Sequence, residues 1–275
     1  MKTATLIILL LQSFLMTMNA QELETVWETD PFLKTTESVF YDSVRNQIYV
    51  SNINGKPTDK DGNGFISLLN TDGTIKVLQW ITGMDAPKGL ALEGNLLFVT
   101  DIDRIHVMDI TTSKIINTIE VPEALFLNDM VLMSPSSFII TDMLNNQLLR
   151  FDGTSATVIM KGGLLNVPNG LAVKNGKLYV GTEENLLLFI PEQNELEIFI
   201  QNTGPIDGLI PLSSDSFVIS DWSGKITQVS KNSKEILQNT TDEKIQAADL
   251  GYIPSKKWVL IPTFFENRVI AKQLP

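Results

Sequence analysis

A short phrase of polar, glycine and apolar residues recurs along the chain, and the residue before its glycine is the best candidate for chemistry. The most complete copy is Val-Pro-Asn-Gly-Leu-Ala-Val at 167–173, and close copies begin at Pro87 and Pro205. If the copies meet in space, carboxylates and amides come together, and such oxygen ligands suit Ca²⁺, Mg²⁺ or Mn²⁺. The alternative is that these polar side chains only face water. In chain order, the candidate position holds Glu37, Lys88, Asn128, Asn169, Asp207 and Ala248.

The spacing of the phrase indicates how its copies are brought together. Positions 37, 88, 128, 169, 207 and 248 lie about 40 residues apart, a period typical of a β-propeller with one four-stranded blade per repeat. Each copy leads into a run of strand-forming residues, such as Leu-Tyr-Val-Gly-Thr at 178–182. We therefore predict an all-β fold, a six-bladed β-propeller. The phrase begins each innermost strand, so all six positions are expected at one mouth of the channel.

The first strand is predicted to close the ring of blades. Residues 22–29 alternate polar and apolar side chains, with Val26 and Trp27 among the apolar ones, and they precede the first copy of the phrase. Pairing of an N-terminal strand with C-terminal strands closes a propeller and removes free sheet edges. We expect residues 269–274 to provide that partner; a flexible tail is the alternative.

Loops at the predicted mouth supply further candidates. Residues 52–64 are rich in Gly, Asp, Asn and Pro, which indicates a loop, and it is long enough to act as a lid. Trp222, Phe264 and Phe265 fall on other loops of the same face. We expect these aromatic side chains to wall a pocket, and local packing between the loops is the alternative.

The copies that hold Glu37, Asn128, Asn169 and Asp207 resemble, in blade order, the regucalcin/gluconolactonase family of six-bladed propellers. The resemblance covers essentially the whole chain after its N-terminal segment. It implies that Glu37, Asn169 and Asp207 bind one divalent metal ion. It also implies that Asn128 contacts the substrate and that Asp207 acts as a general base.

The chain departs from the pattern of that family at three points. Phe126 stands where the family has an arginine that holds a sugar acid, and the following loop is cut to residues 142–147. Lys88 stands in the ring where the family commonly has a small residue. The resemblance therefore supports a metal site more than it supports a sugar-lactone substrate.

Two functional hypotheses from different classes follow. In the first, the protein is a gluconolactonase-like hydrolase of a lactone-like ester. One divalent ion (Ca²⁺, Mg²⁺, Mn²⁺ or Zn²⁺) polarises the carbonyl group, and Asp207 takes a proton. The expected substrate contacts are Asn128, Asp129, Lys88, Trp222, Phe264 and Phe265. In the second hypothesis, the same mouth binds a ligand or protein without catalysis, since propellers host both kinds of function.

The N-terminal segment and the composition bear on location and partners. Lys2 precedes an apolar run at 6–15 and Ala20 ends the segment, which predicts a signal peptide at 1–20 and a propeller domain at 21–275. The run is short for a membrane span, so we favour cleavage over anchoring and expect a periplasmic or secreted protein. The chain has no cysteine and a net charge of −11. These values exclude disulfides and thiolate chemistry and disfavour nucleic acid as a partner.

Two other features receive structural interpretations. Residues 59–66 match the start of an EF-hand calcium loop, but Asn70 stands in place of its closing glutamate and the flanking segments indicate strands. A tight turn is the favoured interpretation, with a structural calcium site as the alternative. His106 is the only histidine, and it alternates with Arg104 and Met108 in a predicted strand, where a structural role is expected. No GxSxG, HExxH or P-loop motif occurs.

Overall fold

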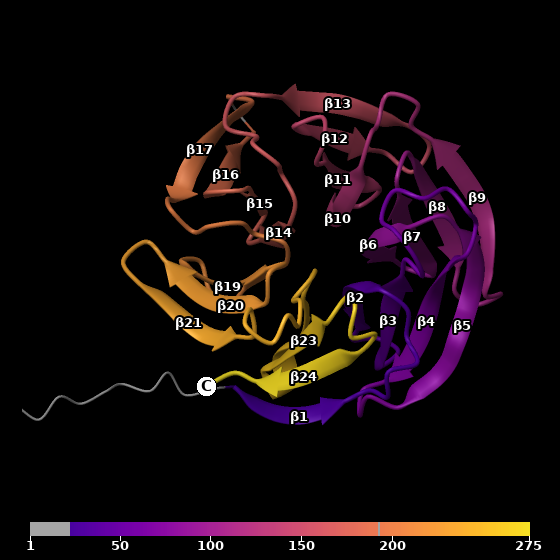
Figure 1. Ribbon diagram of the computed structural model, residues 1–275. Helices are drawn as coiled ribbons and strands as arrows, with labels where there is room; N and C mark the ends of the chain where they lie inside the picture. The colour runs from indigo at the N-terminus through magenta and orange to yellow at the C-terminus, as the bar shows by residue number, and fades with distance from the viewer. Residues whose placement is uncertain (1–22, 192) are drawn as a thin grey trace, which may run out of the picture.

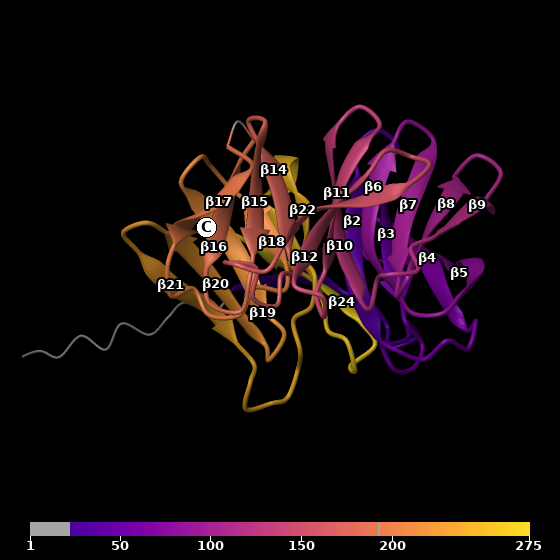
Figure 2. The same ribbon diagram turned by 90° about the horizontal axis from the view of Figure 1, so that it is seen from above.

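The computed structural model describes residues 23–191 and 193–275. Their strands form six antiparallel, four-stranded sheets, which are arranged as blades around a central channel (Figure 1). The view from above shows the sheets standing side by side around the ring (Figure 2). The prediction of an all-β, six-bladed propeller is thus confirmed. The predicted signal peptide at 1–20 lies outside the described residues, among which no helix is long and apolar enough to cross a membrane.

The strands are described by their place within a blade. The innermost strands, which line the channel, are β2 (Thr36–Asp42), β6 (Pro87–Glu93), β10 (Leu127–Ser134), β14 (Leu171–Lys174), β18 (Leu209–Pro211) and β22 (Gly251–Ile253). The second strands are β3 (Gln47–Asn52), β7 (Leu96–Asp101), β11 (Ser137–Asp142), β15 (Lys177–Gly181), β19 (Ser216–Asp221) and β23 (Trp258–Pro262). A short 3₁₀ helix, η1 (Pro254–Lys256), precedes β23.

The two outer positions of each blade complete the sheets. The third strands are β4 (Gly64–Asn70), β8 (Arg104–Asp109), β12 (Gln147–Phe151), β16 (Leu186–Ile190), β20 (Lys225–Ser230) and β24 (Val269–Gln273). The outermost strands are β5 (Ile75–Met84), β9 (Lys114–Glu120), β13 (Ala156–Lys161), β17 (Glu195–Ile200), β21 (Lys234–Asn239) and β1 (Glu24–Glu28). In this arrangement, the loops after each second and each outermost strand open onto the mouth of the channel.

The glycine of the recurring phrase is explained by the closeness of neighbouring blades. A Cβ atom built on Gly89 would lie 2.6 Å from the carbonyl oxygen of Asn128 in the next blade. At Gly170 and Gly208, an added Cβ atom would clash with the backbones of Asp207 and Leu250 in the same way. A side chain at these positions would therefore push the innermost strands apart.

The candidate residue of the phrase does not stand at the same distance from the start of every innermost strand. Glu37, Lys88 and Asn128 are each the second residue of their strand, whereas Asn169 and Asp207 precede β14 and β18 by two residues. The backbone still pairs at these last two positions, because the amide of Asn169 donates to the carbonyl oxygen of Gly181 (3.0 Å) and that of Asp207 to Ser220 (2.8 Å). The residues therefore occupy equivalent places, as predicted.

Apolar side chains packed between adjacent blades hold the ring together. Phe98 of blade two and Phe138 of blade three pack with their ring centroids 4.4 Å apart. Tyr179 of blade four and Phe217 of blade five do the same at 4.8 Å. These pairs belong to buried clusters that span neighbouring sheets. Close packing of this kind fixes the relative positions of the blades, and hence of the innermost strands.

Strand β1 closes the ring, as predicted for the first strand. It pairs antiparallel with β24, with Glu24 opposite Gln273 and Glu28 opposite Ile270. Figure 1 shows the indigo β1 lying along the yellow β24 at the edge of the last blade. The indole nitrogen of Trp27 donates to the carbonyl oxygen of Thr71 (3.1 Å), so β1 also contacts the first blade.

Candidate functional site

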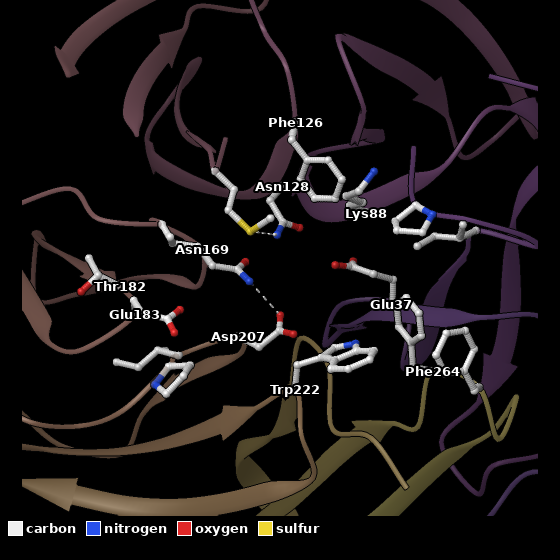
Figure 3. A pocket seen from close by; sticks show the side chains of 17 residues that line it. Glu37, Lys88, Phe126, Asn128, Asn169, Thr182, Glu183, Asp207, Trp222 and Phe264 are labelled. Atoms are coloured by element: carbon white, nitrogen blue, oxygen red, sulfur yellow. Dashed lines mark hydrogen bonds between the residues drawn. The ribbon is translucent and has the colours of Figure 1, made fainter. Parts of the chain in front are cut away.

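A pocket of about 440 Å³ opens at the mouth of the channel. This volume is within the range of small-molecule sites. Its lining, drawn in Figure 3, includes eight residues proposed from the sequence: Glu37, Lys88, Asn128, Asn169, Asp207, Trp222, Phe264 and Phe265. The repeat therefore brings together side chains that are far apart in the sequence.

Asp129 is the proposed site residue that does not line this pocket. It occupies the glycine position of its phrase, and its carboxylate is used between blades. Its Oδ2 atom accepts a hydrogen bond from the backbone amide of Leu171 in the next blade (2.5 Å), and its Oδ1 atom accepts one from the amide of Met130 (2.6 Å). Ala248, the sixth residue of the ring, is buried and does not line the pocket either.

The floor of the pocket is formed by two carboxylates and two amides. The side chains of Glu37, Asn128, Asn169 and Asp207 point toward a common space from four blades (Figure 3). The amide nitrogen of Asn169 donates to Asp207 Oδ1 at 3.2 Å. Glu37 is only 6% exposed, and its Oε2 atom has no hydrogen-bond partner among the described residues. A buried carboxylate oxygen without a partner is costly, so this atom is free to accept a ligand.

Electrostatic repulsion accompanies the burial of these carboxylates. Burial, followed by repulsion from Asp207 and Asp249, raises the pKa of Glu37 well above its ordinary value. Burial and the proximity of Asp249 also raise the pKa of Asp207 to about 8. Burial raises the pKa of Asp249 to about 7, although Ser38 Oγ donates to its carboxylate at 2.5 Å. The floor thus concentrates carboxyl groups that favour protonation in the absence of a cation.

Lys88 is the one cationic side chain in the lining of the pocket. It is 1% exposed, donates from Nζ to the carbonyl oxygen of Ala86 (2.8 Å), and lies 4.4 Å from the ring centroid of Phe126. Burial lowers the pKa of Lys88 to about 8, against the opposing influence of Glu37 and Asp101. Lys88 therefore places a single ammonium group beside the carboxylates, held by a carbonyl group and an aromatic face.

The donor set of the floor fits a divalent cation. The carboxylates of Glu37 and Asp207 and the amide oxygen of Asn169 are hard oxygen ligands, as calcium, magnesium and manganese prefer. The unpartnered Oε2 atom of Glu37 and the mutual repulsion of the carboxylates are both relieved by a positive ion. Within residues 23–191 and 193–275, no group of three or more His, Cys, Asp or Glu side chains is placed to hold a metal. A cation bound here would be held by mixed carboxylate and amide ligands.

The aromatic residues proposed for the wall pack against one another and also line the pocket. The rings of Trp222 and Phe264 are 5.5 Å apart between centroids, and those of Phe264 and Phe265 are 4.8 Å apart, all in edge-to-face orientation. These side chains therefore line the pocket and also pack locally between the loops, the two possibilities considered from the sequence. Phe126, opposite the cluster in Figure 3, contributes a further aromatic face.

The loop predicted as a lid contributes little to the pocket surface. Of its residues, Ile53 and Pro57 line the pocket. Its far end is tied to the second blade, where the amide of Gly62 donates to Asp85 Oδ1 (2.9 Å) and Lys60 pairs with Asp103. The segment that matches an EF-hand start leads into strand β4 rather than a helix, and the carboxylate of Asp61 accepts hydrogen bonds from the backbone and side-chain amides of Asn63.

His106 has a structural environment, as expected for a strand histidine. It is buried in β8, with Nε2 at 2.9 Å from Asp101 Oδ2 and Nδ1 at 2.9 Å from Thr118 Oγ1. Asp101 in turn accepts hydrogen bonds from the backbone amides of Asp85 (2.8 Å) and Ala86 (2.6 Å). This network fixes the carbonyl group that receives Lys88, so His106 supports the pocket from behind.

Several apolar lining residues were not proposed from the sequence. Met143, Val167 and Ile206 line the pocket on the side of blades three to five. Apolar residues of this kind are common throughout the core, so their type carries no signal for a site. The one available signal was position, because Met143 lies in loop 142–147, and Val167 and Ile206 lie in copies of the recurring phrase.

Comparisons with known proteins bear on the fold. No family model and no curated protein matches the sequence. The chain is similar to a streptogramin B lyase, with 14% identity and a TM-score of 0.65 over 92% of this chain and 97% of that one. It is also similar to a catalytically inactive virginiamycin B lyase from Staphylococcus aureus with quinupristin (16% identity, TM-score 0.60, 92% and 99% covered). A chain from a nidogen/laminin complex is similar as well, with 16% identity and a TM-score of 0.63 over 80% of this chain and 85% of that one. At these identities, the similarity shows the propeller fold alone.

Proposed function

We propose that the protein is an exported, metal-dependent hydrolase that acts on a lactone-like ester at the mouth of the channel. The observation that carries this proposal is the Glu37 carboxylate, which is buried among other carboxyl groups and has one oxygen atom without a partner. Together with Asn169 and Asp207, it would hold one divalent cation. The resemblance of the phrases to the regucalcin/gluconolactonase family supports the same three ligands. Export rests on the sequence of residues 1–20 alone.

The residues around the floor have complementary roles in this proposal. A bound divalent ion supplies polarisation of the ester carbonyl and activation of water. Asn128 and Lys88 orient the substrate and donate hydrogen bonds to the oxygen atom that gains negative charge. Asp207 accepts the proton from the attacking water, a role that requires its ionised form, which a bound cation would favour.

The test compares metal binding and turnover in matched variants. Calorimetric titration with Ca²⁺, Mg²⁺, Mn²⁺ and Zn²⁺ should show binding to the wild type, at least about 100-fold weaker binding to Asp207→Ala and Glu37→Gln, and weaker binding to Asn169→Ala. A panel of lactones and esters should be hydrolysed by the wild type only with the metal that binds. Asp215→Ala, an exposed carboxylate in the β18–β19 turn, serves as the control. Equal affinity in all five proteins would eliminate the metal site.

A second candidate is a propeller that binds a ligand or protein without catalysis. The observation in its favour is the apolar rim of the mouth, where Leu125, Leu144, Trp222 and Phe265 are exposed on loops. The structural neighbours of this fold include lyases and a chain from a nidogen/laminin complex, and a fold does not decide function. Metal binding without turnover on the ester panel would select this candidate.

A further inference from the structure

The pocket is polar at its floor and apolar on its walls. Apart from the floor residues and Lys88, the polar residues of its lining are Thr182 and Glu183. Thr182 Oγ1 is already used, since it donates to the carbonyl oxygen of Asn185 (2.9 Å) and accepts from its amide (3.1 Å). The apolar lining residues are Ile53, Pro57, Phe126, Met143, Val167, Pro205, Ile206, Trp222, Phe264 and Phe265.

These walls distinguish between classes of substrate. A hydroxyl group placed against such a wall gives up its hydrogen bonds to water and gains none in return, which is unfavourable. An aliphatic or aromatic group placed there leaves water without that cost, and each buried methylene tightens binding roughly fourfold. Phe126 strengthens the contrast, because its ring carries the Lys88 ammonium group and has no donor for a sugar hydroxyl or carboxylate.

Two wall residues hold a backbone conformation that their side chains disfavour. Val167 and Phe264 both have φ = 51°, in the left-handed region where glycine and asparagine are less strained. Contacts around them maintain this conformation: Val167 N donates to Asn146 Oδ1 (2.8 Å), and the carbonyl oxygen of Phe264 accepts from Thr36 N (3.2 Å). Strain kept beside a pocket indicates that the apolar side chains themselves have a role there.

We propose that the pocket takes lactones or esters that carry an apolar substituent. The ester group lies at the floor, near Asn128 and Lys88, and the substituent lies among the apolar side chains that line the walls, which include Phe126, Val167 and Phe265. This inference rests on the proposed function for the ester group, but the wall can be tested by binding alone. In this proposal, the substrates differ from sugar lactones because they carry an apolar substituent in place of hydroxyl groups.

The test uses three lactones with the same six-membered ring. Glucono-δ-lactone carries hydroxyl groups, δ-valerolactone carries no substituent, and δ-decalactone carries a pentyl chain. Each is titrated calorimetrically into the full chain with chelator present, so that no metal contributes. We expect δ-decalactone to bind at least about 30-fold more tightly than either of the other two, since most of its chain methylenes become buried.

Two variants and a matched control locate the binding surface. Val167→Asn replaces the apolar side chain with one that tolerates positive φ, so the protein should fold at least as well while its affinity for δ-decalactone falls about tenfold. Phe265→Ser should weaken δ-decalactone similarly. Phe32→Ser is the control, because Phe32 is 59% exposed, close to the 58% of Phe265, yet does not line the pocket. Binding of δ-valerolactone should not change in any of them.

The outcomes separate this inference from the proposed function. Tighter binding of glucono-δ-lactone, or equal affinity for all three lactones, would overturn the apolar wall assignment even if the metal-loaded protein hydrolyses esters. Loss of δ-decalactone binding in Phe32→Ser to the same degree as in Phe265→Ser would also overturn it. Selective binding of δ-decalactone without hydrolysis in the presence of each metal would support the wall and contradict the hydrolase.

Discussion

Two sets of buried carboxylates lie at the mouth end of the propeller, and they differ in their partners. Asp101 and Asp142 end the second strands of blades two and three and are fully buried. Asp142 accepts hydrogen bonds from the amides of Leu125 (3.2 Å) and Phe126 (2.9 Å) and from two side-chain amides. Glu37 and Asp207, at the channel mouth, are nearly as buried, yet the Oε2 atom of Glu37 has no partner.

The difference in partners produces opposite effects on protonation. Burial alone would raise the pKa of Asp101, but hydrogen bonds from His106 and from the amides of Asp85 and Ala86 lower it below its ordinary value. At Asp207, burial and Asp249 raise the pKa to about 8, and the single hydrogen bond from Asn169 does not offset them. A buried carboxylate with a full set of donors thus belongs to the fold, whereas one without them is available to a ligand.

The largest effect is expected for removal of a fully partnered carboxylate. Asp142→Ala leaves the partly buried amide of Leu125 and the buried amide of Phe126 without an acceptor, and hydrogen bonds to a charged group contribute about 1.5–3 kcal/mol each. The free energy of unfolding in urea should therefore fall by about 4 kcal/mol. A decrease in the free energy of unfolding of less than about 1 kcal/mol would show that the number of hydrogen-bond partners does not distinguish structural carboxylates from those at the channel mouth.

The pH dependence of the stability of the metal-free protein should reveal the carboxyl groups at the channel mouth, which have few hydrogen-bond partners. Asp207 has a folded pKa of about 8, above its ordinary value of 3.8. The folded state therefore holds a proton that the unfolded state has lost, so stability falls as pH rises from about 4 to 8. The pKa of Lys88 is lowered from 10.5 to about 8. Above pH 8 the folded state has therefore lost a proton that the unfolded state still holds, so stability rises again. In chelator, the free energy of unfolding should pass through a minimum near pH 8, where it is about 3–4 kcal/mol lower than at pH 5.

The control for this pH effect is Asp207→Asn, which removes one titrating carboxyl group while keeping its shape. Its decrease in stability between pH 5 and pH 8 should be smaller than that of the wild type. An identical profile in the two proteins would show that Asp207 is not responsible for the effect.

A smaller effect of opposite sign is expected for Glu37→Gln. Glutamine cannot ionise, so the variant lacks the repulsion from Asp207 and Asp249 that raises the pKa of Glu37. At a pH at which the wild-type carboxyl groups ionise, the metal-free variant should therefore be more stable by about 1 kcal/mol. With metal at 100 times its dissociation constant, the wild type should gain about 2.7 kcal/mol and the variant should not. Thermal unfolding with and without metal measures both effects, and the same order of stability under both conditions would contradict the metal site.

The smallest effect is expected for an exposed ion pair of the same region. Lys60 pairs with Asp103, with side-chain exposures of 48% and 20%. Solvent screens such a pair, so Lys60→Ala should cost less than about 1 kcal/mol and leave metal affinity unchanged. A loss comparable to that of Asp142→Ala would show that loop 53–63 is part of the structural core rather than an attachment at the mouth.

The sequence predicted the elements that follow from repetition. The period of the phrase indicated the blade count and the residues Glu37, Asn128, Asn169 and Asp207, because equivalent positions of a closed repeat meet at one axis. The alternation of residues 22–29 indicated the role of the first strand. Asp129 was predicted to be a site residue only because it follows Asn128 in the sequence. It stands at the glycine position of its phrase, and its side chain lies between two blades, where it accepts a hydrogen bond from the amide of Leu171.

The partners of the buried carboxylates could not be predicted from the sequence. Asp142 receives the amides of a loop that is 16–17 residues earlier in the chain, and nothing in its local sequence marks it as different from a loop aspartate. The apolar wall was missed for a similar reason, because Val167 and Ile206 resemble core residues. Both depend on tertiary contacts that only the assembled ring creates.

The pairing of β1 with β24 has a mechanical consequence. Because the two strands are antiparallel and Glu24 lies opposite Gln273, both chain ends leave the last blade from the same end of this strand pair. A force applied between the ends therefore peels the strands apart one hydrogen-bonded pair at a time, from Glu24 toward Glu28, instead of loading all the pairs together. Under tension the propeller should open first at this seam and release blade six, while the other blades keep their four strands.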